Sequence, residues 1–153
     1  MMKTKFEKQR NDLRKESPVM KNNNSNNIIS IKEHVADLGS VRHLDIWLAD
    51  IPLRADTHIQ GGPRPVVVVS NNETNRHSTV ISVIPLTTNM KFQWMVSHVR
   101  LEGGGLRYPS LALIDQITTI DRSQLIHRIG HLDRPGEVAA IKIALLSYMN
   151  LTA

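Results

Sequence analysis

Hydrophobic positions from residue 45 onward fall into short runs separated by turn residues, a pattern typical of a small β protein. Residues 65–70 form a continuous valine-rich run that is too short for a globular helix, so they predict a buried strand. Further strands are predicted at residues 46–51, 79–86, 96–101 and 110–115, with residues 118–120 continuing the last one past a bend. Five or six such strands predict a strongly bent, barrel-like sheet with helices packed at its side.

Helical patterns in this part of the chain lie near its end. A short helix is predicted to start at Asp121 and to run to about Ile126, followed by a brief extended piece at residues 131–132. Asp133 is a suitable N-cap for a final helix, because its carboxylate can accept a backbone N–H, and Pro135 falls in the first turn. The predicted core face of that helix carries Val138, Ile141, Leu145, Tyr148 and Met149. Residues 71–75 and the three glycines at 103–105 are predicted as turns.

Residues 1–40 differ from the rest of the chain. They carry 8 Lys/Arg against 5 Asp/Glu, and the stretch at 21–27 is almost entirely asparagine. Apolar spacing predicts a short helix at 28–38 that ends at Gly39. We therefore expect a basic, partly disordered N-terminal extension over residues 1–40 and one domain over 41–153. Met20 offers an alternative start.

Composition adds only weak constraints. The chain has 153 residues, 41% of them hydrophobic, which is enough for one domain with a core. It has no cysteine, which excludes disulfides and thiolate metal sites and fits a cytoplasmic protein. No segment reaches the roughly 18 apolar residues that a membrane span needs. The formal charge of +5 weakly suggests a polyanionic partner.

Metal and cofactor motifs are not found. Among seven histidines, His127 and His131 have helical i, i+4 spacing but lack the glutamate of a zinc-binding pair. The glycines at 103–105 are not followed by the lysine and hydroxyl residue of a nucleotide-binding loop. We expect neither a metal nor a cofactor.

Polar residues instead stand where apolar strands begin or end. Arg64 opens one strand, Thr87 closes the next and Asp115 closes a third. In a small barrel these ends meet at one rim, where an arginine fork and a hydroxyl could bind a phosphate and a carboxylate could act as a base. RNA would supply its own nucleophile, the 2′-hydroxyl. The alternatives are a surface ion pair for Arg64, an ordinary strand position for Thr87 and a turn cap for Asp115.

Blocks of sequence in this order resemble the MazF/PemK family of toxin endoribonucleases. The first two are DIWLAD at 45–50 and QGGPRPVVVV at 60–69. The others are IPLTT at 84–88, SHV at 97–99, DQITTID at 115–121 and HLD at 131–133. The resemblance covers about residues 43–152.

The resemblance implies an SH3-like barrel that forms a homodimer and cuts single-stranded RNA at specific sequences without a metal. It also implies a cognate antitoxin whose extended segment fills the RNA groove, with DNA contacted only in that complex. By position, Arg64, Thr87 and Asp115 match the catalytic residues. His58, Gln60, Gln116 and Thr118 are expected to bind substrate.

Two positions depart from the family pattern. Ile59 replaces a frequent glutamate and Thr118 replaces a frequent arginine, and the loss of that cation weakens phosphate binding. They leave open a non-catalytic member that binds nucleic acid or antitoxin. A DNA-binding repressor lacks a helix-turn-helix pattern to support it. Trp47 is expected in the core, whereas Phe92 and Trp94 lie in a loop suited to RNA or antitoxin.

Overall fold

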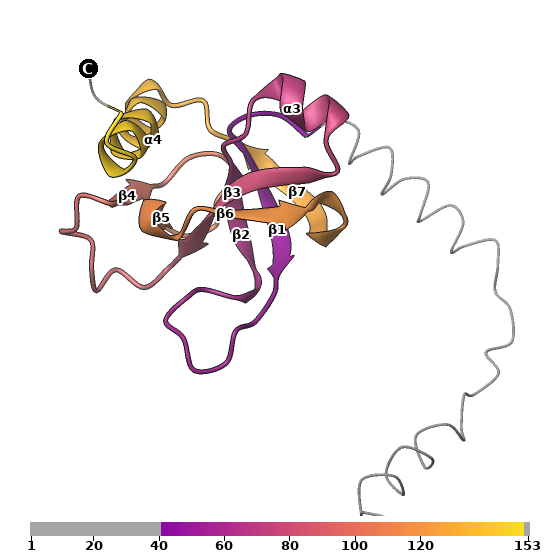
Figure 1. Ribbon diagram of the computed structural model, residues 1–153. Helices are drawn as coiled ribbons and strands as arrows, with labels where there is room; N and C mark the ends of the chain where they lie inside the picture. The colour runs from indigo at the N-terminus through magenta and orange to yellow at the C-terminus, as the bar shows by residue number, and fades with distance from the viewer. Residues whose placement is uncertain (1–40, 152–153) are drawn as a thin grey trace, which may run out of the picture. The chain divides into compact units, whose positions relative to one another are not determined.

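The computed structural model describes residues 41–151, which form one bent antiparallel sheet with two helices (Figure 1). Seven strands are present in this part of the chain. They are β1 (Asp45–Ile51), β2 (Gly62–Val68), β3 (Val80–Thr87), β4 (His98–Leu101), β5 (Ser110–Leu113), β6 (Thr118–Asp121) and β7 (Leu125–His131). The extension and the helix predicted within residues 1–40 lie outside the described residues.

Strand β3 is responsible for the bend of the sheet. The strands follow the order β4-β5-β3-β2-β1-β7, and β6 pairs with β3 off this path. The first half of β3 pairs with β6, whereas Leu86 and Thr87 at its end pair with β5. One strand therefore passes from one part of the sheet to another. The predicted fold class, mainly β with a C-terminal helix, is confirmed.

The helical segments are α3 (Asn72–His77), α4 (Pro135–Tyr148) and two 3₁₀ turns, η1 (Ile114–Gln116) and η2 (Arg122–Gln124). The prediction of a turn at 71–75 was wrong, because Asn71 caps a helical turn by accepting the N–H of Thr74 at 2.8 Å. The helix predicted from Asp121 is only the short η2.

Among the residues that the structure describes, no helix is both long and apolar enough to cross a membrane.

Helix α4 begins one residue later than predicted. Arg134, not Asp133, occupies the N-cap, and it makes no side-chain cap bond, while Pro135 takes the first position as expected. On the face toward the sheet, Ile141 and Ala144 are buried. Tyr148 and Met149, predicted on that face, are 47% and 48% exposed. Tyr148 instead lies against η1, where its hydroxyl donates to the Asp115 carbonyl.

Apolar side chains from β1 and β2 enter two separate cores, because neighbouring residues in a strand point to opposite faces. Trp47 and Ile46 lie in different cores and both are fully buried, which confirms the predicted place of Trp47. Three consecutive valines of β2 are also fully buried, as expected for a strand covered on both sides: Val66, Val67 and Val68. Helix α4 covers the core that contains Ile46 and Val67.

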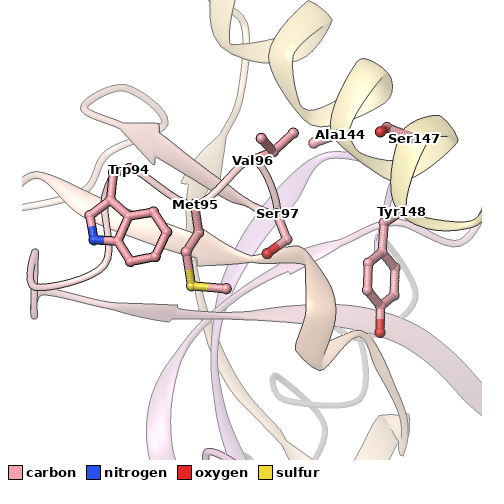
Figure 2. A pocket seen from close by; sticks show the side chains of 7 residues that line it. All are labelled: Trp94, Met95, Val96, Ser97, Ala144, Ser147 and Tyr148. Atoms are coloured by element: carbon pink, nitrogen blue, oxygen red, sulfur yellow. The ribbon is translucent and has the colours of Figure 1, made fainter.

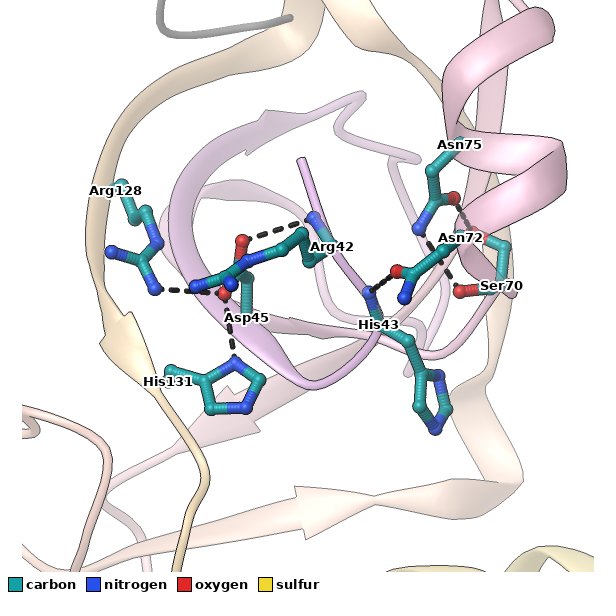
Figure 3. Close-up of polar contacts among 8 residues, drawn as sticks. All are labelled: Arg42, His43, Asp45, Ser70, Asn72, Asn75, Arg128 and His131. Atoms are coloured by element: carbon teal, nitrogen blue, oxygen red, sulfur yellow. Dashed lines mark hydrogen bonds and ion pairs between the residues drawn. The ribbon is translucent and has the colours of Figure 1, made fainter. Parts of the chain in front are cut away.

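A buried carboxylate ties β1 to β7. Asp45 Oδ1 lies 2.9 Å from Arg128 Nη2 and 2.9 Å from His131 Nδ1, and its Oδ2 accepts the backbone N–H of Arg42 at 3.0 Å (Figure 3). Nearby, the Asn72 side chain accepts the N–H of His43. The contacts of Asp45 tie the start of the domain to its last strand, where Gly130 also allows β7 to lie against the Gly104 backbone.

Candidate active site

A pocket of about 410 Å³ opens where the β1–β2 loop approaches the end of β3, the start of β4 and η1. Five of the seven predicted site residues line it: His58 and Gln60 from the loop, Thr87 from β3, and Asp115 and Gln116 from η1. The other lining residues are Asn89, Phe92, Met95, His98, Leu111 and Leu113. The fold thus gathers side chains that are far apart in the chain.

Arg64 stands in β2 opposite Ala49 and is half-buried. Its Nε donates to the Gly61 carbonyl at 3.0 Å and its Nη1 donates to Gln60 Oε1. Arg64 therefore reaches the pocket through Gln60 and does not line the pocket itself. Both acceptors are neutral, so the guanidinium charge is not cancelled by these contacts. Burial lowers the pKa of Arg64, yet a guanidinium keeps its charge in proteins.

Gln116 fastens the β1–β2 loop to η1. Its Oε1 accepts the backbone N–H of Gln60 at 2.7 Å, and its Nε2 donates to the His58 carbonyl at 3.4 Å. Gln116 therefore uses its side-chain amide for the loop backbone, and it sets the position of the two predicted substrate-binding residues His58 and Gln60. Gln116 therefore supports the wall of the pocket.

Asp115 has a partner that sequence reasoning did not assign to the site. His98 Nε2 lies 3.3 Å from Asp115 Oδ1, and the other ring nitrogen, Nδ1, lies 3.0 Å from the Phe92 carbonyl. The His98 side chain is only 7% exposed, whereas that of Asp115 is 31% exposed. The SHV block was the signal that could have identified His98. Tyr148 of α4 also reaches η1, donating to the Asp115 carbonyl at 3.3 Å.

Thr87 and Thr118 occupy different places. The Thr87 hydroxyl lines the pocket and accepts the N–H of Asn89 at 3.2 Å, which leaves its proton available to a ligand. Thr118 lies outside this pocket, in an adjoining one of about 230 Å³ that Ile59 also lines. The two pockets share Gln60, Asp115 and Gln116 on their walls. The two positions that depart from the family pattern, Ile59 and Thr118, therefore line the same adjoining pocket.

Comparison with known proteins shows the family of this chain. The sequence matches the family described as PemK-like, MazF-like toxin of type II toxin-antitoxin system over residues 42–148. The chain belongs to the MazF/PemK toxin family. It is also 31% identical over 115 residues to "Endoribonuclease EndoA" of Bacillus subtilis, covering 71% of this toxin and 98% of that protein.

Solved structures share the fold of the toxin. One is the Mycobacterium tuberculosis toxin MazF-mt6, with a TM-score of 0.59 and 24% identity over 71% of this chain and 99% of that chain. Another is an endoribonuclease from a mycobacterial species in complex with its cognate antitoxin. Its TM-score is 0.62 at 22% identity, and the match covers 74% of this chain and 99% of that one.

A third, more apolar pocket lies between the β3–β4 loop and α4 of the toxin. It has a volume of about 420 Å³ and is lined by Trp94, Met95, Val96, Ser97, Ala144, Ser147 and Tyr148 (Figure 2). Trp94 is 75% exposed and Val96 is 81% exposed. Phe92 stacks edge-on against Trp94, with ring centroids 6.4 Å apart.

Within residues 41–151, no three His, Cys, Asp or Glu side chains gather as a metal site.

Proposed function

We propose that this toxin is a sequence-specific endoribonuclease that cuts single-stranded RNA without a metal ion. The observation that carries the proposal is one pocket that combines Asp115 and Thr87 with Gln60, to which the Arg64 guanidinium is bound. This set can receive a phosphate beside a carboxylate. Family membership and the relative named as an endoribonuclease support the same activity.

Each residue has a role in the proposed reaction. Asp115 takes the proton of the 2′-hydroxyl, and the freed oxygen attacks the adjacent phosphorus. Arg64 and the Thr87 hydroxyl stabilise the negative charge that grows on the phosphate oxygens. The 5′-oxygen leaves as a hydroxyl, and the phosphorus remains as a 2′,3′-cyclic phosphate. The 5′-oxygen takes its proton from water, and the remaining hydroxide takes the proton held by Asp115, so no net proton is consumed.

Substrate selection falls to the groove around these groups. His58, Gln60 and Gln116 in the first pocket, and Thr118 in the adjoining one, offer donors and acceptors for the edges of unpaired bases. Phe92 and Trp94 add aromatic surface next to the pocket. DNA without a 2′-hydroxyl can bind such a groove but cannot react.

The proposed partners follow from exposed apolar surface. The outer side of α4 exposes Ile143 by 66% and Leu146 by 45%, an area suited to a second copy of the chain. Related structures include MazE–MazF complexes from Deinococcus radiodurans, which supports a cognate antitoxin. We expect a cytoplasmic homodimer that is neutralised by this antitoxin and contacts DNA only together with it.

The test incubates the purified toxin with RNA in EDTA and maps the ends of the products. We expect cyclic phosphate and 5′-hydroxyl ends, and no cut where a single 2′-deoxy nucleotide replaces the one before the cleaved bond. Arg64→Ala should lower kcat by about 10² to 10³-fold, the usual loss for one transition-state donor. Arg76→Ala on α3, where Arg76 pairs with Glu73 at the surface, is the matched control and should cut normally.

A non-catalytic binding function is the second candidate, because Ile59 and Thr118 remove charged groups from the adjoining pocket. It would appear as salt-dependent RNA binding with intact RNA even at high protein concentration. That result would reject the nuclease and retain the groove as a binding surface.

A further inference from the structure

The two ring nitrogens of His98 face two different groups of the pocket wall. Its Nδ1 lies 3.0 Å from the Phe92 carbonyl oxygen, which also accepts the N–H of Met95 at 3.1 Å. A carbonyl oxygen only accepts hydrogen bonds, so the Nδ1 atom must carry a proton. In a neutral imidazole this leaves Nε2 without a proton.

The second ring nitrogen then faces an acceptor. His98 Nε2 lies 3.3 Å from Asp115 Oδ1, within ion-pair distance, and this buried oxygen has no hydrogen-bond partner of its own in the structure. Two lone pairs that face each other in a buried place repel, so a proton has to lie between them. The proton is bound either to Nε2, next to an ionised carboxylate, or to Oδ1, next to a neutral imidazole. In both arrangements the pair shares one proton.

We propose that His98 is a positioning residue for Asp115, which it holds through this shared proton, and that it ties the β3–β4 loop to the same carboxyl group. The inference rests on the proposed function in assigning Asp115 the role of base. Because Oδ1 is buried, the 31% of the side chain that is exposed belongs to its other atoms. The second oxygen, Oδ2, is therefore the one that meets the RNA.

The pair can take up the 2′-hydroxyl proton from either arrangement. If the shared proton is on Nε2, Oδ2 accepts the new proton directly. If it is on Oδ1, it passes to Nε2 as Oδ2 accepts the new one. Both routes end with an imidazolium beside a neutral carboxylic acid. The leaving 5′-oxygen takes a proton from water, and the hydroxide that remains takes the acid proton from Oδ2, which returns the pair to its starting state. The other titratable side chain that lines the pocket is His58.

Two substitutions separate the two contacts of His98. In His98→Gln the amide nitrogen can reach the place of Nε2 and keep the hydrogen bond to Asp115. In His98→Asn the shorter amide matches Nδ1, so it keeps the Phe92 contact and loses Asp115. We expect kcat to fall on the order of tenfold to hundredfold in His98→Asn and clearly less in His98→Gln, with KM within about twofold in both. Thermal unfolding confirms that both variants fold.

A double variant and a spectrum complete the test. His98→Asn combined with Asp115→Asn should be no slower than Asp115→Asn alone, because the two residues act as one unit. Nitrogen-15 spectra of the imidazole ring should show the His98 Nε2 signal changed in Asp115→Asn while the Nδ1 signal stays. An unchanged Nε2 signal, or His98→Gln slower than His98→Asn, would overturn the proposal. If the wild-type toxin cuts no RNA, the proposed function fails and the spectra alone decide the pairing.

Discussion

At the scale of single residues, the contacts of Arg64 show how a guanidinium can be oriented while its charge stays available to an anion. Its partners are a backbone carbonyl and the Gln60 amide oxygen, which orient the guanidinium without neutralising it. A phosphate can displace such neutral acceptors and gain the full charge interaction. The prolines at 63 and 65 restrict the backbone beside it, so little further ordering is needed when an anion binds.

Thr118 gives the first residue-scale prediction. Thr118→Arg should strengthen RNA binding, because it adds a cation to the pocket that Asp115 and Gln116 share with the main site. The slope of log affinity against log salt should steepen by about 0.7, the value for one more phosphate contact on a single strand. Binding of a labelled, uncleavable 2′-deoxy oligonucleotide across a salt series measures it.

The control for this change is Thr74→Arg, which adds the same charge on the exposed surface of α3. An equal effect of both substitutions on affinity and slope would show that net charge, rather than this pocket, is responsible.

At the scale of elements, β7 shows how a strand can depend on a distant carboxylate. Its sequence, LIHRIGH, has no clear alternation, and only residues 131–132 were predicted as extended. The strand pairs with β1 through two irregular steps in register. Arg128 and His131 on it meet Asp45 of β1. The partner strand, more than the local pattern, therefore determines that residues 125–131 are extended.

Asp45→Asn should destabilise the toxin by about 2 kcal/mol at pH 7, since it leaves buried charge-assisted hydrogen bonds incomplete. Burial raises the pKa of Asp45, but hydrogen bonds from Arg128, His131 and the Arg42 backbone outweigh burial and hold this pKa below 3.8. The folded state therefore binds this proton less readily than the unfolded state. The stabilisation from the ionised Asp45 is complete above the unfolded-state pKa. It is lost as the pH falls through the lower folded-state pKa.

Urea unfolding at several pH values measures the effect of Asp45. The difference between wild type and Asp45→Asn should be largest near neutral pH and should shrink in acid. Asp50→Asn, an exposed position on the same strand, should change the free energy of unfolding by no more than about 0.5 kcal/mol. A difference that stays constant down to low pH would contradict the assignment of the stabilisation to the ionised carboxylate.

At the scale of the whole molecule, α4 is apolar on both its sides. Ile141 and Ala144 face the core, while Ile143, Leu146 and Met149 are exposed. A helix that is apolar all round is normally covered all round. The described part of the chain covers only one side, so a second protein surface is expected on the other.

Ile143→Glu should convert a dimeric toxin into a monomer, because it places a charge in the expected interface. Light scattering after size-exclusion chromatography measures the mass. Leu53→Glu is the control, because Leu53 is 81% exposed and belongs to the β1–β2 loop instead of α4. A wild-type toxin that is already monomeric, or a dimer that survives Ile143→Glu, would reject this surface as the interface.

The sequence by itself determined the strands with strong apolar runs, the final helix and the family, because each of these depends on neighbouring residues or on blocks in fixed order. It also indicated that Arg64, Thr87 and Asp115 belong to one rim. It missed α3, which begins at the side-chain cap of Asn71 and has almost no apolar pattern. It also missed most of β7, which is held by β1.

Only the tertiary structure decided which groups face one another. It placed five predicted residues around one pocket and Thr118 in the next, and it joined Arg64 to the site through Gln60. It also set His98 against Asp115, because Leu113 pairs with His98 across β4 and β5 and η1 then turns Asp115 back. A side-chain contact between residues 17 positions apart depends on strand register, which local sequence does not contain.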